Sequence, residues 1–135
     1  MTSRFAILGP NPMEFGMAKA IGVGGLFFRA KDPDALKVWY ETHLGINPAP
    51  TDMEMMPWMT EPGVTVFSPF ASDTDYFRAD KMFMINFRVD DMEAMIVQLT
   101  DAGIEIKNDQ LVDGIGRFVH IEDPEGTPIE LWQPA

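Results

Sequence analysis

The sequence contains no cysteine, and positive charge is scarce relative to negative charge. The missing cysteine excludes disulfides, thiolate nucleophiles and metal sites built on cysteine. The 10 lysines and arginines stand against 21 aspartates and glutamates, which gives a formal net charge of −11. A surface of that sign repels nucleic-acid phosphates and anionic lipid headgroups, so we expect neither nucleic acid nor membrane as a partner.

Long hydrophobic runs are also missing from the 135-residue chain. No stretch approaches the roughly 20 apolar residues that a membrane-spanning helix needs. Pro10, Asn11 and Pro12 interrupt the short apolar stretch near the start of the sequence, which argues against a signal peptide. We therefore expect a cytoplasmic protein with one globular domain over residues 21–135, preceded by an N-terminal arm over residues 1–20.

An internal repeat organises this domain. When the sequence is aligned with itself, residues 28–32 match residues 87–91, and residues 66–69 match residues 131–134. Both matches occur in the same order in the two halves, which predicts a domain made of two similar modules. The predicted parts are a first module over about 21–70, a polar surface linker over 71–81 and a second module over about 82–135.

Each module has the pattern of a strand, a helix and further strands. Residues 26–30 and 84–89 are apolar runs of strand length, and each is followed by an aspartate that can cap a helix. Strand patterns return after each helix, over residues 63–69 and 117–132, and a turn interrupts the second of them at residues 123–126. The helix caps predicted from this pattern are Asp32 and Gly45 in the first module, and Asp91 and Gly103 in the second.

The chain resembles the vicinal oxygen chelate superfamily, which contains glyoxalases, bleomycin-resistance proteins and extradiol dioxygenases. The resemblance rests on residues 28–32, on residues 39–45, and on the closing stretch DPEGTPIEL at 123–131, which is similar to the family pattern D-P-x-G-x-x-x-E-L. It implies an α+β fold in which two tandem βαβββ modules form a concave mixed-sheet cleft. It also implies a homodimer.

Strand side chains alternate between the two faces of a sheet, which assigns residues to this cleft. Leu26, Phe28 and Ala30 form the apolar set expected under the first helix, so the residues between them face the cleft. The same argument and the repeat predict a cleft that contains Gly25, Phe27, Arg29, Thr65, Phe67, Met84, Asn86, Arg88, Glu130 and Trp132.

The resemblance also identifies the positions at which metal-dependent members bind a divalent ion, one from each of four strands. These positions are occupied here by Gly25, Thr65, Met84 and Glu130. Only Glu130 is a suitable ligand, because glycine has no side chain and a thioether is too soft for the usual divalent ions. We therefore expect no metal and no other cofactor.

Glu130 and His120 are the candidate catalytic residues. If the turn at 123–126 places His120 directly across from Glu130, the two side chains share a face and can act as an acid/base pair. If the register differs by one residue, Val119 takes that place and His120 points away. The sequence leaves both registers open.

Arg29 and Arg88 are repeat equivalents, and both are predicted to face the cleft. They either form ion pairs that hold the two sheets together, for example with Glu130, or act as a bidentate clamp for a carboxylate or another planar anion.

Residues 47–63 form a proline-interrupted loop, which argues against a helix there. Its soft side chains either cover an apolar ligand or pack over a sheet edge or a dimer seam. The residues concerned are Met53, Met55, Met56, Trp58 and Met59.

The preferred hypothesis is a bleomycin-resistance-like protein that binds a small organic molecule in an apolar cleft without a catalytic metal. The first alternative is a metal-free isomerase or lyase that uses Glu130 or His120 as a general base, and the second is a divalent-metal enzyme of the glyoxalase or dioxygenase type. Whether the protein is an enzyme stays open. The predicted ligand-binding residues are Phe27, Arg29, Trp58, Phe67, Met84, Asn86, Arg88 and Trp132.

Overall fold

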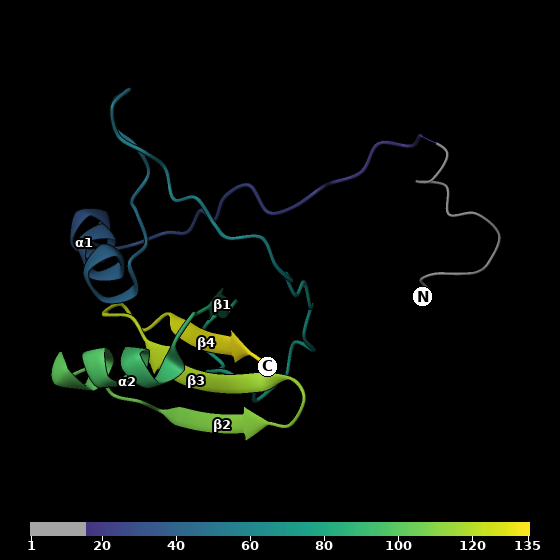
Figure 1. Cartoon of the computed structure of the whole chain (residues 1–135), viewed down its shortest axis with the longest axis vertical. Coiled ribbons are helices and arrows are strands. Elements are labelled where there is room, and N and C mark those ends of the chain that lie inside the picture. The colour runs from purple at the N-terminus through teal and green to yellow at the C-terminus, as the bar shows by residue number, and fades with distance from the viewer. Residues whose placement is uncertain (1–15) are drawn as a thin grey trace.

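The computed structural model describes residues 16–135, and Figure 1 shows its two helices and four strands. Residues 1–15 of the expected N-terminal arm lie outside the described part of the chain. In chain order the elements are α1 (Pro33–Leu44), β1 (Ile85–Arg88), α2 (Met92–Asp101), β2 (Asn108–Val112), β3 (Gly116–Glu122) and β4 (Pro128–Pro134). Neither helix is long and apolar enough to cross a membrane.

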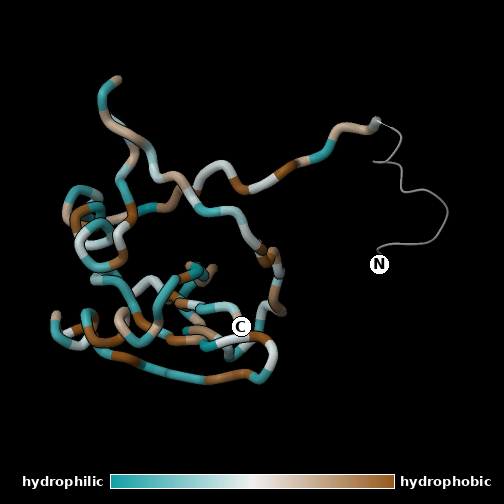
Figure 2. Tube along the Cα trace, in the orientation of Figure 1, coloured by the Kyte–Doolittle hydropathy of each residue, from teal (hydrophilic) through white to brown (hydrophobic). Residues whose placement is uncertain are grey.

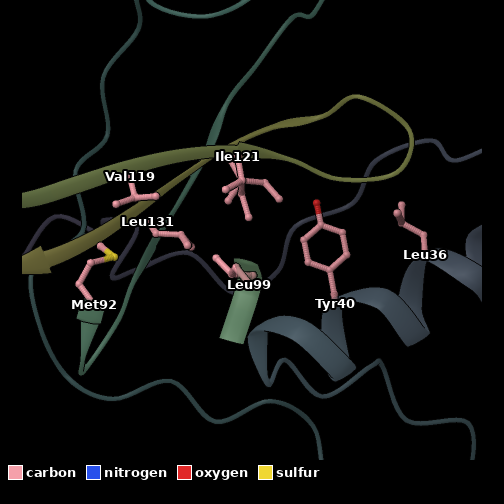
Figure 3. Packing of buried hydrophobic residues seen from close by; sticks show 8 residues of the cluster. Leu36, Tyr40, Met92, Leu99, Val119, Ile121 and Leu131 are labelled. Atoms are coloured by element: carbon pink, nitrogen blue, oxygen red, sulfur yellow. The ribbon is translucent and has the colours of Figure 1, made fainter. Parts of the chain in front are cut away.

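The strands form one mixed sheet in the order β1-β4-β3-β2. β1 runs parallel to β4, whereas the pairs β3–β4 and β2–β3 are antiparallel. Both helices contribute to a hydrophobic core on one face of this sheet (Figure 3). The buried residues of the core are Leu36, Tyr40, Met92, Leu99, Val119, Ile121, Ile129 and Leu131.

Three of the four helix caps predicted from the sequence are confirmed, whereas α2 has Ala102 as its C-cap and Gly103 follows it with a φ of 79°. The side chain of Asp32 accepts a 3.1 Å hydrogen bond from the backbone N–H of Ala35, and α1 ends at Gly45, whose φ of 70° lies in the left-handed region. The side chain of Asp91 caps α2 in the same way, through the N–H of Ala94. The two modules therefore use the same local chemistry to start their helices.

The second half of the chain forms the predicted module. Its elements β1, α2, β2, β3 and β4 give the βαβββ order, and the turn at residues 123–126 connects β3 to β4 as expected. The predicted α+β class is confirmed.

The first half differs from the prediction. Residues 26–30 and 63–69 form no strands, although their sequence patterns match those of β1 and β4. Figure 1 shows both segments as extended chain, and Figure 2 shows hydrophobic residues along them. A strand is stabilised by backbone hydrogen bonds to a neighbouring strand, and neither segment has such a neighbour within residues 16–135. Only α1 of the first module is formed, and it completes the core of the second.

Candidate ligand site around Glu130

Glu130 lies on the sheet face that the helices leave uncovered. Its neighbours in β4, Ile129 and Leu131, point into the core, so alternation turns Glu130 to the opposite face. The antiparallel pairing of β3 with β4 places His120 directly across from Glu130, and the parallel pairing of β1 with β4 places Asn86 on its other side. Of the two registers that the sequence left open, the structure has the one in which His120 and Glu130 share a face.

Three side chains donate hydrogen bonds to the Glu130 carboxylate. His120 Nε2 lies 2.7 Å from Oε2, and Asn86 Nδ2 lies 2.8 Å from Oε1. The third donor is the hydroxyl of Tyr76, which also binds Oε2. Only 6% of Glu130 is exposed, so this carboxylate obtains its hydrogen bonds from the protein instead of from water. We call Tyr76, Asn86, His120 and Glu130 the Glu130 cluster.

Tyr76 was missed by sequence reasoning. It lies in residues 71–81, which read as a polar surface linker and which contain no helix or strand. The only available signal was the group of aromatic residues in and beside this otherwise polar segment, Phe70, Tyr76 and Phe77. In the structure the ring of Phe70 contacts the rings of the other two.

The electrostatics of the Glu130 cluster favour a charged carboxylate and a neutral phenol. Burial acts to raise the pKa of Glu130, but the hydrogen bonds from His120, Tyr76 and Asn86 together outweigh it and hold the pKa below its usual range. Burial, followed by the hydrogen bond and the charge of Glu130, raises the pKa of Tyr76 to about 12. An ionised carboxylate only accepts hydrogen bonds, so His120 Nε2 carries the proton in its bond to Glu130.

Aromatic rings surround the cluster. The ring of Tyr76 meets that of His120 edge to face, with centroids 5.3 Å apart, and it lies 5.5 Å from the ring of Phe70. On the same sheet face Trp132 stacks flat on Phe118, and its Nε1 donates a 3.1 Å hydrogen bond to a backbone carbonyl. The site therefore combines one buried charge with flat apolar surfaces, a common composition of small-molecule sites.

An open hollow of about 550 Å³ adjoins the cluster. Tyr76 and His120 belong to its wall, together with Met84, which the sequence analysis assigned to the cleft. The rest of its lining comes largely from residues 73–79 and from the ends of β2, β3 and β4.

The structure does not bring all predicted site residues to this place. Arg88 donates hydrogen bonds of 2.8 Å and 3.3 Å to the backbone carbonyls of Glu61 and Pro62, so it neither pairs with Glu130 nor presents a free fork to an anion. The ring of Trp58 packs edge to face against Phe87. The remaining candidates lie in the unpaired first module and are exposed, namely Gly25, Phe27, Arg29, Thr65 and Phe67.

The donor set does not fit a divalent metal ion. Among residues 16–135 there is no group of three or more histidine, aspartate or glutamate side chains placed to hold one. Both oxygens of Glu130 are already engaged by Asn86, His120 and Tyr76. The other positions implied by the resemblance hold Gly25, Thr65 and Met84, which leaves Glu130 as the single suitable ligand.

Comparison with solved structures identifies the fold. TnmS3, an antibiotic binding protein from a Streptomyces species, is 23% identical with a TM-score of 0.56, over 87% of this chain and 100% of that chain. A member of the glyoxalase/bleomycin resistance protein/dioxygenase superfamily from Sphaerobacter thermophilus is 16% identical with a TM-score of 0.49, over 77% and 90% of the two chains. A glyoxalase family protein from Enterococcus faecalis is 28% identical with a TM-score of 0.37, over 47% of this chain and 52%, about half, of its own length.

No family model matches the sequence, and no curated protein is detectably similar to it. The match to TnmS3, over 87% of this chain, shows that the two proteins share a fold. Identities at this level establish the fold and leave the ligand to be argued from the site.

Proposed function

We propose that the protein binds a small organic molecule beside Glu130, without a catalytic metal. The observation that carries this proposal is a buried carboxylate held by three side-chain donors, two of which, Tyr76 and His120, belong to the wall of an open hollow. A hollow of about 550 Å³ is within the usual range for small-molecule sites. The antibiotic binding named for TnmS3 gives further support, because that protein shares the fold over most of this chain.

A metal-free isomerase or lyase is the second candidate, and the 2.7 Å contact between His120 and Glu130 favours it. The lowered pKa of Glu130 makes this carboxylate a weak base. His120 is the better base in this arrangement, because the hydrogen bond to Glu130 keeps a proton on Nε2 and leaves Nδ1 as the nitrogen that can accept one. Glu130 then acts as the residue that positions His120.

We further propose that the protein is a homodimer in the cytoplasm. The cysteine-free, acidic composition suits a reducing compartment. The dimer is supported by the first module, whose strand-like segments have no pairing partner within residues 16–135. The first module exposes an unusual amount of apolar surface for a monomer, above all at Ile21, Val23, Phe27, Val64, Val66 and Phe67.

The binding proposal is tested by native mass spectrometry of the purified protein, followed by thermal shift with a library of aromatic and other small organic molecules. A ligand of the proposed kind raises the melting temperature with or without EDTA, because a ligand that binds only the folded state stabilises it. Glu130→Gln should weaken that shift, whereas Glu41→Gln, an exposed glutamate in α1, should not. Screening that yields no bound molecule and no shift overturns the proposal.

The same bound molecule separates the two candidates. Under the binding proposal its mass and its chemical shifts stay unchanged after prolonged incubation with the protein. If the wild-type protein converts the molecule, and His120→Asn still binds it but no longer converts it, the isomerase or lyase is favoured.

A further inference from the structure

The hydroxyl of Tyr76 donates a hydrogen bond to Glu130 Oε2 from a segment without helix or strand. We propose that the natural ligand is a flat aromatic molecule with a phenol-type hydroxyl, and that this hydroxyl replaces that of Tyr76 on Glu130 Oε2. In this proposal Tyr76 occupies the ligand position when no ligand is bound. This inference rests on the proposed function and specifies the ligand class for that same site.

The acceptor defines the polar part of the ligand. Glu130 is buried, and the hydrogen bonds around it favour the ionised form, so it accepts donors and repels anions. The cations on the wall of the hollow, Arg78 and Lys107, are paired with carboxylates, and Arg88 is engaged by two backbone carbonyls. A neutral O–H donor therefore suits this site better than a carboxylate or phosphate does. A hydroxyl bound to a carboxylate also makes one of the stronger hydrogen bonds in proteins.

The neighbouring rings define the apolar part of the ligand. Tyr76 is in edge-to-face contact with His120, at an interplanar angle of 81°, and in tilted contact with Phe70. Aromatic pairs of this geometry are favourable beyond the area they bury. When the Tyr76 ring leaves, the same contacts become available to another aromatic ring.

Tyr76 is the donor that is easiest to displace. Asn86 and His120 lie on β1 and β3, which both pair with β4, whereas Tyr76 lies in a segment without helix or strand and is 43% exposed. The segment is held to the β3–β4 hairpin by a partly exposed ion pair between Arg78 and Glu122 and by hydrogen bonds from Arg78 and Lys81 to backbone carbonyls of the turn. Ion pairs at such partly exposed positions contribute little. Withdrawal of Tyr76 leaves Oε2 one donor short, and the ligand hydroxyl restores that donor.

The first experiment compares p-cresol, which has the ring and hydroxyl of a tyrosine side chain, with toluene, which lacks the hydroxyl. Calorimetric titration of the full chain should detect p-cresol binding and weaker or no toluene binding. Removal of an internal competitor increases the fraction of binding-competent protein, so Tyr76→Ala should bind p-cresol about tenfold more tightly. Met82→Ala, an exposed change just beyond the same segment, should leave the affinity unchanged.

The second experiment separates displacement from simple filling of the space that Tyr76→Ala creates. The chain has two tyrosines, Tyr40 and Tyr76, so ring-labelled wild-type protein gives two tyrosine signals, which Tyr76→Phe assigns. Saturation with p-cresol should move the Tyr76 signal toward that of a solvent-exposed tyrosine and leave that of buried Tyr40 in place.

The outcomes distinguish this inference from the function on which it rests. A Tyr76 signal that does not move, an affinity that falls in Tyr76→Ala, or equal binding of toluene overturns the displacement of Tyr76 by a hydroxyl. If other aromatic molecules bind at Glu130 while p-cresol does not, the inference is wrong and the binding function stands. If no small molecule binds to the wild-type protein or to Tyr76→Ala, both the inference and the proposed binding function are wrong.

Discussion

Tyr40 donates a 2.7 Å hydrogen bond to Asp123, and this buried contact joins the helix of the first module to the β3–β4 turn of the second. The other oxygen of Asp123 accepts the backbone N–H groups of Glu125 and Thr127, which fixes the shape of the turn. Asp123 therefore has two structural roles, which explains why an aspartate opens the closing DPEG pattern. Only 5% of Asp123 is exposed, so water cannot replace the hydroxyl if it is removed.

We predict that Tyr40→Phe lowers the free energy of unfolding by about 1–3 kcal/mol, because it leaves a buried acceptor without its donor. Urea denaturation followed by circular dichroism measures this change. Val38→Ala, at an exposed position of α1, should have little effect. In a double-mutant cycle with Asp123→Asn the two changes should be strongly coupled, and purely additive effects would mean that the contact does not hold the two modules together.

The Glu130 cluster predicts a specific dependence of stability on pH. The pKa of Glu130 is lower in the folded protein than the ordinary value of 4.5 for a glutamate, so its ionised form stabilises the fold. This contribution is fully present above the unfolded pKa and is lost as the pH falls through the folded pKa. Glu130→Gln should therefore reduce stability at neutral pH and flatten its decline below about pH 4.5. Urea melts at a series of pH values test this, and an unchanged acid profile would contradict the lowered pKa.

Much of the second module could be predicted from the sequence, because its signals are local. Asp91 precedes an apolar helix, and residues 123–126 form a turn between two strand patterns, so the helix and the hairpin follow from short-range chemistry. The alternation of side chains along each strand then predicts that Asn86 and Glu130 lie on the same face of the sheet. The position of His120 required the exact register, which depends on the turn geometry and not on the pattern.

The first module and Tyr76 could not be predicted for a different reason. The strand patterns of residues 26–30 and 63–69 match those of β1 and β4, but a pattern does not supply the neighbour with which a strand must pair. Tyr76 lies 54 residues from Glu130 in the sequence, in a segment without periodicity, so no local signal predicts their contact. In both cases the structure depends on contacts between residues that are far apart in the sequence.

We predict that divalent metal ions are not required for ligand binding. Among the four positions that correspond to metal ligands, only Glu130 has a suitable side chain. Both of its carboxylate oxygens already accept hydrogen bonds, from Asn86, His120 and Tyr76. Protein purified without chelator should contain no stoichiometric metal by elemental mass spectrometry, and EDTA should leave the melting temperature and ligand affinity unchanged. One ion per chain that disappears in Glu130→Ala would reverse this interpretation.

We predict that the segments that stay unpaired within one chain become strands in the dimer. In the second module Phe87 pairs with Leu131, and the repeat aligns these residues with Phe28 and Val66. Light scattering of the 15.2 kDa chain should therefore give twice that mass. Amide hydrogens of residues 26–29 and 64–67 should exchange slowly in the dimer, because backbone pairing protects them.

Substitutions in these segments test whether they are the contact between the two copies. Phe67 is 87% exposed, so Phe67→Glu costs a single chain little but places a charge in the proposed interface. Val66→Pro removes a backbone donor from the expected strand pairing. Both variants should shift the protein toward monomer and lose the exchange protection, whereas Val97→Glu, at an exposed position of α2, should stay dimeric. A wild-type protein that is monomeric at all concentrations, or variants that dimerise as well as it does, would show that a second copy does not complete the first module.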